Sequence, residues 1–302
     1  MRPALKSQQG FTLIELSIVL VIIGLIVGGV LVGQDLIRAA AVRAQITQIE
    51  QYNTAVNTFY GKYGALPGDI PANSAVQFGL SSSVAARTFL SFIYGDGNGV
   101  ITGIYNGSGG GESALFWMDL AAAGLIPAPS QICADGSGVY GGDCAQPAKI
   151  GMGNGIYVFS NGYQSGSWVS AGSNYFGISA SVTSVGGTWT TSNPGLTVAQ
   201  AYAMDKKLDD GLPQSGNVIA AYLNLSTVNP NGYGGDYGMP VWVNPGGVSV
   251  VYWGVTTSAI TGSSTTCYDN ASGTLAYQQY SISQNGGAGV NCALSFKMQA
   301  GD

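Results

Sequence analysis

The stretch FTLIELSIVLVIIGLIVGGVLV, residues 11–32, contains a single charged side chain, that of Glu15. No proline occurs between Pro3 and Pro67, so nothing in this part of the chain breaks a helix. At 1.5 Å per residue, a helix over this stretch is about 30 Å long, which is enough to cross the hydrocarbon core of a bilayer. We therefore predict a membrane-length helix at the amino end.

The charges around this helix predict its orientation and its partners. Arg2 and Lys6 precede the apolar run, so we expect the amino end to face the cytoplasm. The Glu15 carboxylate costs a few kcal/mol in an apolar surrounding unless it has a partner. A cut after Gly10 would create an α-amino group on Phe11, too close in the helix to pair well with Glu15 of the same chain. We expect Glu15 to pair with the amine of a neighbouring copy, so that identical helices pack with a stagger.

The segment Gly10-Phe11-Thr12-Leu13-Ile14-Glu15-Leu16 resembles the type IV prepilin signature, which type II secretion pseudopilins share. That signature has a short basic leader ending in glycine, then phenylalanine, then a glutamate at the fifth mature position. The resemblance implies cleavage after Gly10 by a prepilin peptidase, N-methylation of Phe11, and a role for Glu15 in subunit docking. It covers the amino-terminal segment only.

An ordinary secretory signal or a simple anchor is the alternative interpretation of this segment. Ala39-Ala40-Ala41 offers a small-residue cleavage site for a signal peptidase. However, the apolar run is longer than a usual signal core and carries Glu15 at its start. These two features favour the prepilin interpretation.

The helical pattern continues beyond the apolar run. Val42, Ile46, Ile49, Val56 and Tyr60 recur at helical spacings and form one apolar stripe. Stop signals follow at Gly61, Gly64 and Pro67. Four glycines interrupt the apolar half, and either close helix packing or local unwinding accounts for them: Gly24, Gly28, Gly29 and Gly33. The resemblance and this pattern predict an α+β, pilin-like fold with a leader (1–10), a helix (11–60) and a β-rich head (61–302).

The head reads as short strands separated by turn residues, with two short helices. Thr197 and Gln200 form a capping-box pattern at the start of one helix. We expect an antiparallel sheet with long surface loops. The predicted helices are Glu112–Ala123 and Thr197–Leu208, and the predicted strands are Ile156–Ser160, Tyr175–Val182, Val218–Leu223, Val241–Val243, Val248–Val255, Leu275–Ile282 and Ala293–Met298.

Four cysteines fit an exported protein, and they allow three disulfide connectivities. We expect nearest neighbours to pair, Cys133 with Cys144 and Cys267 with Cys292, because each pair then closes one Gly-rich or polar loop. No Cys-x-x-Cys occurs, which disfavours zinc and redox functions. A disulfide-closed carboxyl-terminal loop also resembles the exposed loop of many type IV pilins.

Two acidic motifs are candidate calcium ligands because calcium prefers clustered hard oxygens. They are Asp96 with Asn98, and Asp209 with Asp210. The first is not an EF-hand loop, since Val100 occupies its fifth position. The competing interpretations are a plain turn and a helix-ending turn, and negative charge at a helix carboxyl end is unfavourable unless a cation, Lys206 or Lys207 relieves it. Major pseudopilins bind calcium in their heads, so the resemblance supports the metal interpretation.

Composition excludes several function classes. The 302 residues include 10 basic and 15 acidic side chains, a net charge of −5, and no histidine. Imidazole catalysis and His-ligated zinc are therefore excluded, and we expect neither enzymatic activity nor nucleic-acid binding. Tyrosines and tryptophans of the second half either pack in the core or bind a ligand at the surface: Tyr233, Tyr237, Trp242, Tyr252 and Trp253.

We conclude from the sequence that the chain is a structural subunit of a type IV pilus-like filament. The expected partners are copies of itself, other pilins or pseudopilins, the prepilin peptidase and an inner-membrane assembly platform. We expect it in the bacterial inner membrane before assembly and in a periplasmic or cell-surface filament afterwards. The alternatives are a pseudopilin of a type II secretion system and a minor pilin with a role in adhesion or uptake.

Overall fold

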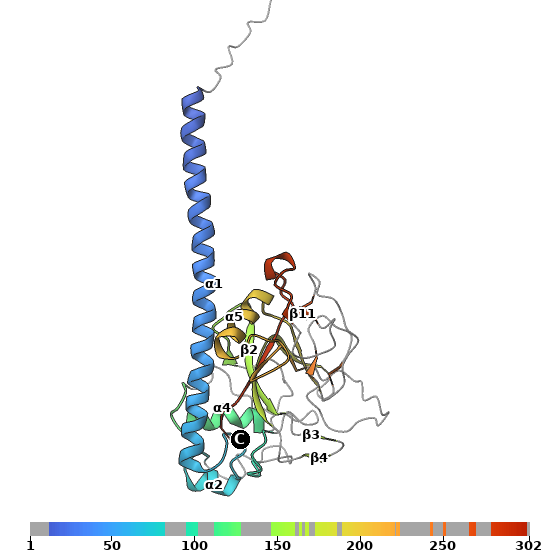
Figure 1. The fold of residues 1–302 in the computed structure, drawn as a ribbon. Helices are drawn as coiled ribbons and strands as arrows, with labels where there is room; N and C mark the ends of the chain where they lie inside the picture. Colours follow the sequence, from blue (N-terminus) through green and yellow to red (C-terminus); the bar gives the residue numbers. More distant parts are fainter. Residues whose placement is uncertain are drawn as a thin grey trace, which may run out of the picture. The chain divides into compact units, whose positions relative to one another are not determined.

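The computed structural model forms two compact units, one ending at Ala41 and the other starting at Val42. Helix α1 (Leu13–Tyr63) runs through the boundary, so its second half belongs to the second unit (Figure 1). The structure describes residues 12–81, 95–101, 112–127, 146–160, 163–164, 167–168, 173–185, 189–220, 222–223, 242–243, 250–251, 266–269 and 279–300, and all structural statements below concern these.

Helix α1 is longer than the predicted 11–60. It continues through Gly61 to Tyr63 and ends where Gly64 takes a left-handed conformation, with φ +71°. Glycine adopts this conformation without strain and commonly ends helices. The predicted apolar stripe is present from Val42 onward, but Tyr60 is exposed and Phe59 is buried in its place.

The main sheet of the second unit has six strands and is antiparallel, as predicted. Its central strand β5 (Asn174–Val185) pairs with β2 (Asn154–Ser160) on one side and with β13 (Leu294–Lys297) on the other. Ile156, Ile178 and Leu294 are aligned across these three strands, and all are buried. The outer strands are β1 (Gln146–Pro147), β6 (Trp189–Asn193) and β7 (Val218–Ile219).

Smaller elements complete the second unit. A three-stranded sheet contains β8 (Tyr222–Leu223), β9 (Trp242–Val243) and β10 (Val250–Val251). The predicted strand over 218–223 is therefore wrong as a single element, because β7 and β8 belong to different sheets. Two hairpins and a short 3-10 helix remain: β3 (Tyr163–Gln164) with β4 (Ser167–Trp168), β11 (Tyr268–Asp269) with β12 (Gln279–Tyr280), and η3 (Asn285–Gly287).

Two predicted helices are present, and they pack on the sheet region. In α4 (Glu112–Ala122), Trp117 is buried, and its ring lies 4.9 Å from that of Tyr52 on α1 and 6.4 Å from that of Phe176 on β5. These contacts attach the second half of α1 to the head core. Helix α5 (Val198–Leu208) begins with the predicted capping box of Thr197 and Gln200. A further short helix, α2 (Ala72–Gln77), was not predicted.

A disulfide joins Cys267 to Cys292. Cys292 also forms a β-bridge with Leu196, just before α5, through hydrogen bonds in both directions. The disulfide-closed segment is thereby attached to the start of α5. Cys133 and Cys144 lie outside the described residues, so their pairing stays a prediction.

Candidate functional site

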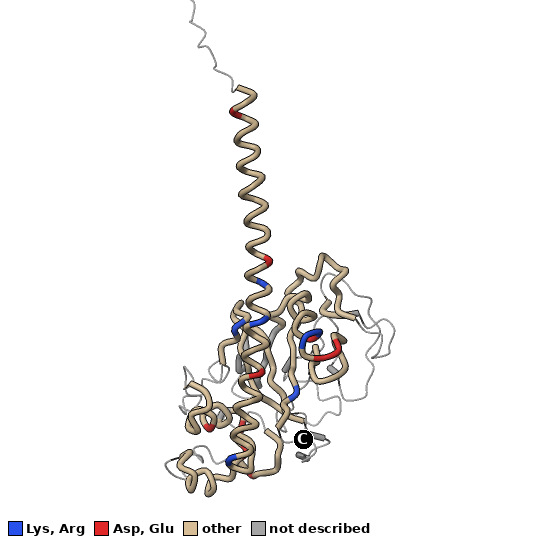
Figure 2. The backbone as a smooth tube through the Cα atoms, turned by 60° about the vertical axis from the view of Figure 1, so that its left-hand side comes forward, with Lys and Arg blue, Asp and Glu red and all other residues tan. Residues whose placement is uncertain are grey.

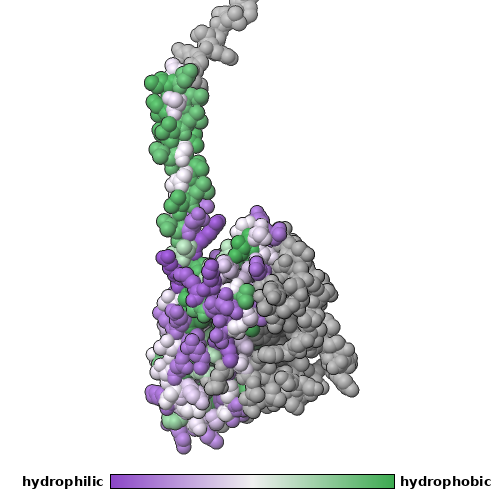
Figure 3. Space-filling model, viewed as in Figure 1, coloured by the Kyte–Doolittle hydropathy of each residue, from purple (hydrophilic) through white to green (hydrophobic). Residues whose placement is uncertain are grey.

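The first part of α1 exposes an apolar surface of membrane length. Every large apolar side chain from Leu13 to Val32 is between 50% and 87% exposed. Figure 3 shows this part of α1 as hydrophobic, and Figure 2 shows how few charges it carries. Among the described residues, one helix is long and apolar enough to cross a membrane. Such a surface requires either lipid or the surface of a partner to cover it.

Glu15 is held at the start of α1 by Thr12. Its carboxylate Oε2 accepts hydrogen bonds from the Thr12 backbone N–H at 2.8 Å and from the Thr12 hydroxyl at 2.7 Å. The Glu15 N–H donates to Thr12 Oγ1 at 3.3 Å. This reciprocal pair is a capping box, and it places negative charge where the helix dipole favours it.

Glu15 stands out in the sequence, but Thr12 was not predicted as its partner within the chain. The Thr-x-x-Glu spacing at the start of an apolar helix is a readable signal for this contact. The two bonds accepted by the carboxylate both use Oε2, which leaves Oε1 facing no donor of Thr12. Gly10 and Phe11, the predicted cleavage and methylation positions, lie outside the described residues.

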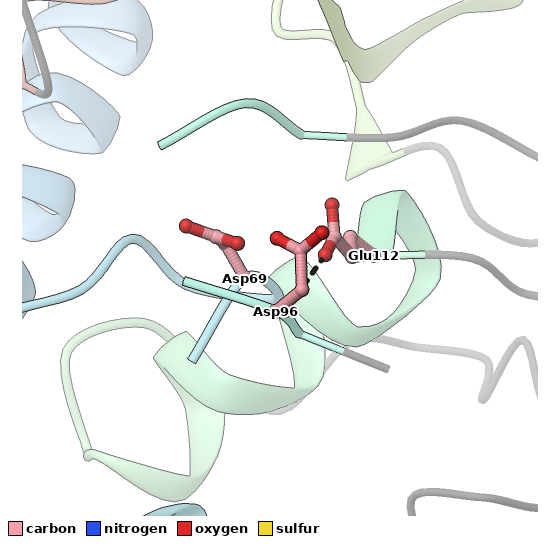
Figure 4. A group of neighbouring side chains, drawn as sticks. All are labelled: Asp69, Asp96 and Glu112. Carbon is pink, nitrogen blue, oxygen red and sulfur yellow. Dashed lines mark hydrogen bonds between the residues drawn. The ribbon is translucent and has the colours of Figure 1, made fainter. Parts of the chain in front are cut away.

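The predicted calcium ligand Asp96 is part of a three-carboxylate group with Asp69 and Glu112. Oxygens of the three side chains lie within 4.8 Å of one another (Figure 4). Asp69 and Glu112 are buried, whereas Asp96 is exposed. The Asp96 N–H donates to Glu112 Oε1 at 3.4 Å. Asp69 and Glu112 were not predicted as members of this group, because only the fold brings them next to Asp96.

Asp69 organises the loop that carries Asp96. Its carboxylate accepts the backbone N–H groups of Gly97, Asn98 and Gly99 at 2.9, 3.2 and 2.9 Å. Burial raises the pKa of Asp69, and the hydrogen bonds from Gly99 and Gly97 partly oppose that shift. The side-chain oxygen of Asn98, also a predicted ligand, instead accepts the Val100 N–H at 2.7 Å.

Gly68, just before Asp69, lets this segment pack closely against α4. Its N–H donates to Asp119 Oδ2 at 2.7 Å, and its φ is +82°. A Cβ at this position would lie 2.2 Å from the Glu112 backbone oxygen. Neither the conformation nor the space admits a side chain.

We expect Gly68→Ala to destabilise the head by about 3 kcal/mol or more, because the backbone of α4 must move and φ is left-handed. Gly79→Ala is the matched control, since Gly79 has φ +72° but nothing within 4 Å of an added Cβ, and we expect it to cost only about 1 kcal/mol. Urea unfolding of the full chain in detergent micelles measures both. Equal losses in the two variants would contradict the close contact with α4.

The other predicted ligands, Asp209 and Asp210, form a second group with Asp205. Asp205 is fully buried; its Oδ1 accepts the Gly211 N–H at 3.0 Å and its Oδ2 accepts the Tyr280 hydroxyl at 2.6 Å. This bond links α5 to the disulfide-closed segment. Asp96 belongs to the other group, with Asp69 and Glu112.

Backbone N–H groups, rather than lysine side chains, donate hydrogen bonds to the carboxylates at this end of α5. Asp209 Oδ2 accepts the N–H groups of Asn217 and Val218, the latter at 3.0 Å. Asp210 Oδ1 accepts the Leu212 N–H at 2.8 Å. Lys206 lies over the ring of Tyr202, with Nζ 5.3 Å from the ring centroid. The acids at the end of α5 therefore serve at least to accept hydrogen bonds from the backbone of the loop that ends the helix.

Burial raises the pKa of Asp205 to about 7; hydrogen bonds from Tyr280 and Gly211 oppose the shift, and the charges of Asp210 and Asp209 add to it. Between about pH 4 and about pH 7 the folded protein holds a proton on Asp205 that the unfolded chain has already released, so the free energy of unfolding falls as pH rises across this interval. We expect the melting temperature to fall between about pH 4 and about pH 7, and Asp205→Asn to make that fall shallower. Thermal unfolding across this range tests it, and an unchanged slope in the variant would contradict it.

Calcium binding stays a prediction for both acidic groups. Neighbouring carboxylates repel one another, and a divalent cation among their oxygens would relieve the repulsion. We expect calcium to raise the melting temperature relative to protein treated with a chelator, and Asp96→Asn or Asp210→Asn to reduce that rise. Magnesium serves as the control ion. No difference between calcium and chelator would show that neither group binds the ion.

Residues 5–31 match a family model described as the prokaryotic N-terminal methylation motif. The matched range includes Gly10, Phe11 and Glu15, together with most of the exposed apolar part of α1. The chain therefore carries a prepilin-type segment, the signal shared by type IV pilins and pseudopilins. Comparison of the chain with curated proteins and with solved structures found no match.

Proposed function

We propose that the chain is a structural subunit of a type IV pilus-like extracellular filament. In this proposal, a prepilin peptidase cuts after Gly10, Phe11 is N-methylated, and subunits assemble through the apolar part of α1. The observation that carries the proposal is a methylation motif on the exposed, membrane-length apolar part of α1, which begins with a carboxylate. No catalysed reaction is part of the proposed role, since the motif is that of structural pilins.

The apolar surface explains why the subunit passes from membrane to filament. Lipid covers this surface in the bacterial inner membrane, and the helices of other subunits cover it in the filament. Because lipid tails and apolar side chains are similar surroundings, this exchange gives little net driving force. An ion pair between Glu15 and the new α-amino group of a neighbour supplies a directional contribution and selects one register. The assembly platform and other pilins are the further partners of this proposal.

Two other roles use the same amino-terminal segment. A pseudopilin of a type II secretion system carries the same signal and assembles in the periplasm. A minor pilin would place the chain in an adhesive or uptake filament. The candidate ligand-binding residues for this role are Tyr233, Tyr237, Trp242, Tyr252 and Trp253, and the structure describes only the backbone of Trp242 among them.

Cell fractionation separates these roles. We expect the protein in the sheared surface fraction of a wild-type strain, and its loss from that fraction in a strain without prepilin peptidase. Retention in the envelope, again dependent on the peptidase, favours the pseudopilin. A low, constant ratio to a more abundant sheared subunit favours the minor pilin. A soluble extracellular protein that is independent of the peptidase overturns the proposal.

A further inference from the structure

Among the described residues, β1 is an edge strand of the main sheet of the second unit. In an antiparallel pair, the backbone groups of successive residues point alternately toward the partner strand and away from it. The Ala148 N–H donates to Asn154 O, toward β2. The Pro147 carbonyl and the Lys149 N–H therefore point away from β2, on the side where no strand of the described residues pairs with β1.

Two glutamines of α1 occupy the place of that missing strand. Gln48 Nε2 donates to the Pro147 carbonyl at 3.0 Å, and Gln48 Oε1 accepts the Lys149 N–H at 2.9 Å. One turn earlier, Gln45 Oε1 accepts the Ile150 N–H at 3.0 Å. The Gln48 amide thus makes the paired donor and acceptor contacts of a neighbouring strand, and Gln45 holds the Ile150 N–H in the turn that follows β1.

The burial of Gln45 indicates that its amide is kept for this contact. Its side chain is fully buried, and its Nε2 has no hydrogen-bond partner among the described residues. A buried donor without a partner is unfavourable, so an apolar residue would suit this position better if packing alone mattered. An apolar residue at this position could not accept the hydrogen bond from the Ile150 N–H.

We propose that Gln45 and Gln48 are positioning residues that fix the register of residues 42–63 of α1 on the head by closing the β1 edge of the sheet. The neighbouring apolar residues Ile46 and Ile49 pack without strong directionality, whereas hydrogen bonds depend on distance and angle. A shift of α1 by one residue turns the helix by about 100° and moves both amides away from the edge. An open edge would also offer unpaired groups to another extended chain.

The relevance of this register to function rests on the proposed function. In a polymer joined through α1, every head must have the same rotational position about residues 42–63 of its own helix. The contacts of Gln45 and Gln48 with the head all lie within a single chain. The role of these glutamines can therefore be tested on the monomer in detergent micelles, where filament assembly plays no part and a negative result would leave the proposed function standing.

Hydrogen exchange at the amides of Lys149 and Ile150 is the direct test. In the full chain we expect both amides to exchange slowly, as those of β2 do. Gln48→Leu should speed exchange at Lys149, and Gln45→Leu at Ile150, by about tenfold or more, with β2 unchanged. Gln51→Leu is the matched control, because Gln51 is an exposed glutamine on the same helix.

Substitution by glutamate separates positioning from space filling. Gln48→Glu keeps an acceptor for the Lys149 N–H, so we expect it to preserve protection that Gln48→Leu loses. The opposite order would overturn the proposal, as would fast exchange at Lys149 and Ile150 in the unchanged protein. That last measurement needs no variant, so the test holds even if a substituted chain does not fold.

A chemical cross-link between α1 and the head measures the register directly. Asn53 Oδ1 accepts the Gln299 N–H at 3.3 Å, which brings α1 next to the segment after β13. We expect Asn53→Cys with Gln299→Cys to be joined efficiently by a short bifunctional thiol reagent. Adding Gln45→Leu and Gln48→Leu should lower the yield several-fold, whereas adding Gln51→Leu should not. An undiminished yield would overturn the assignment of register to these glutamines.

Discussion

Replacing Glu15 with valine is expected to reduce incorporation into filaments by at least about tenfold while leaving cleavage after Gly10 intact. The reason is electrostatic: two opposite charges about 4 Å apart at an effective dielectric constant of about 20 attract by about 4 kcal/mol, and about 1.4 kcal/mol corresponds to a factor of ten. Valine also removes the carboxylate that accepts two hydrogen bonds from Thr12. Quantitative blotting of the sheared and envelope fractions measures the effect.

Glu50→Gln is the control for this prediction. Glu50 is an exposed glutamate in the second half of α1, outside the apolar part. We expect the Glu50 variant to assemble at the wild-type level. Normal assembly of the Glu15 variant would show that the carboxylate does not set the register.

Gly10→Val is expected to keep the leader attached and to remove the protein from filaments altogether. Without cleavage, Phe11 has no free α-amino group to be methylated or to pair with Glu15 of a neighbour. Arg2 and Lys6 would also remain on the subunit and hold its amino end at the cytoplasmic face. An immunoblot that resolves the ten-residue leader, combined with shearing, measures both effects.

Gly61→Ala is the matched glycine substitution. Gly61 lies inside α1, and an added Cβ there would meet nothing within 4 Å. We expect normal cleavage and assembly of this variant. Filaments built from an uncleaved Gly10 variant would contradict the role given to the new amino terminus.

Local patterns predicted the helices well because their determinants lie within a few residues. The stripe from Val42 and the capping box of Thr197 are both set by spacings of three or four positions. The end of α1 was less predictable, since Gly61 and Gly64 both look like stop signals. Only Gly64 adopts the left-handed conformation that ends the helix.

The strands were harder to predict because their partners are distant in sequence. Val218–Leu223 is apolar throughout, yet β7 pairs with β13 and β8 pairs with β9. Between them, the Ala220 N–H donates to the Pro213 carbonyl, which takes it out of either ladder. This turn contact cannot be inferred from periodicity.

The candidate sites also differ in whether local sequence or distant contacts determine them. Glu15 was identified because a charge stands out in an apolar run, whereas its contact with Thr12 depends on a cap geometry that the structure supplies. Asp69 and Glu112 join Asp96 only through the packing of the segment around Gly68 against α4. The glutamines of α1 gave no signal in the sequence, because their role depends on where the sheet edge lies.

In the proposed function, Phe11 becomes the methylated amino terminus of a subunit in a filament. The most direct measurement is the mass of the amino-terminal peptide of this protein, taken from filaments sheared from cells. We expect a peptide that begins at Phe11 and carries one N-methyl group. A peptide that retains residues 1–10, or a chain that begins beyond Ala41, would contradict it.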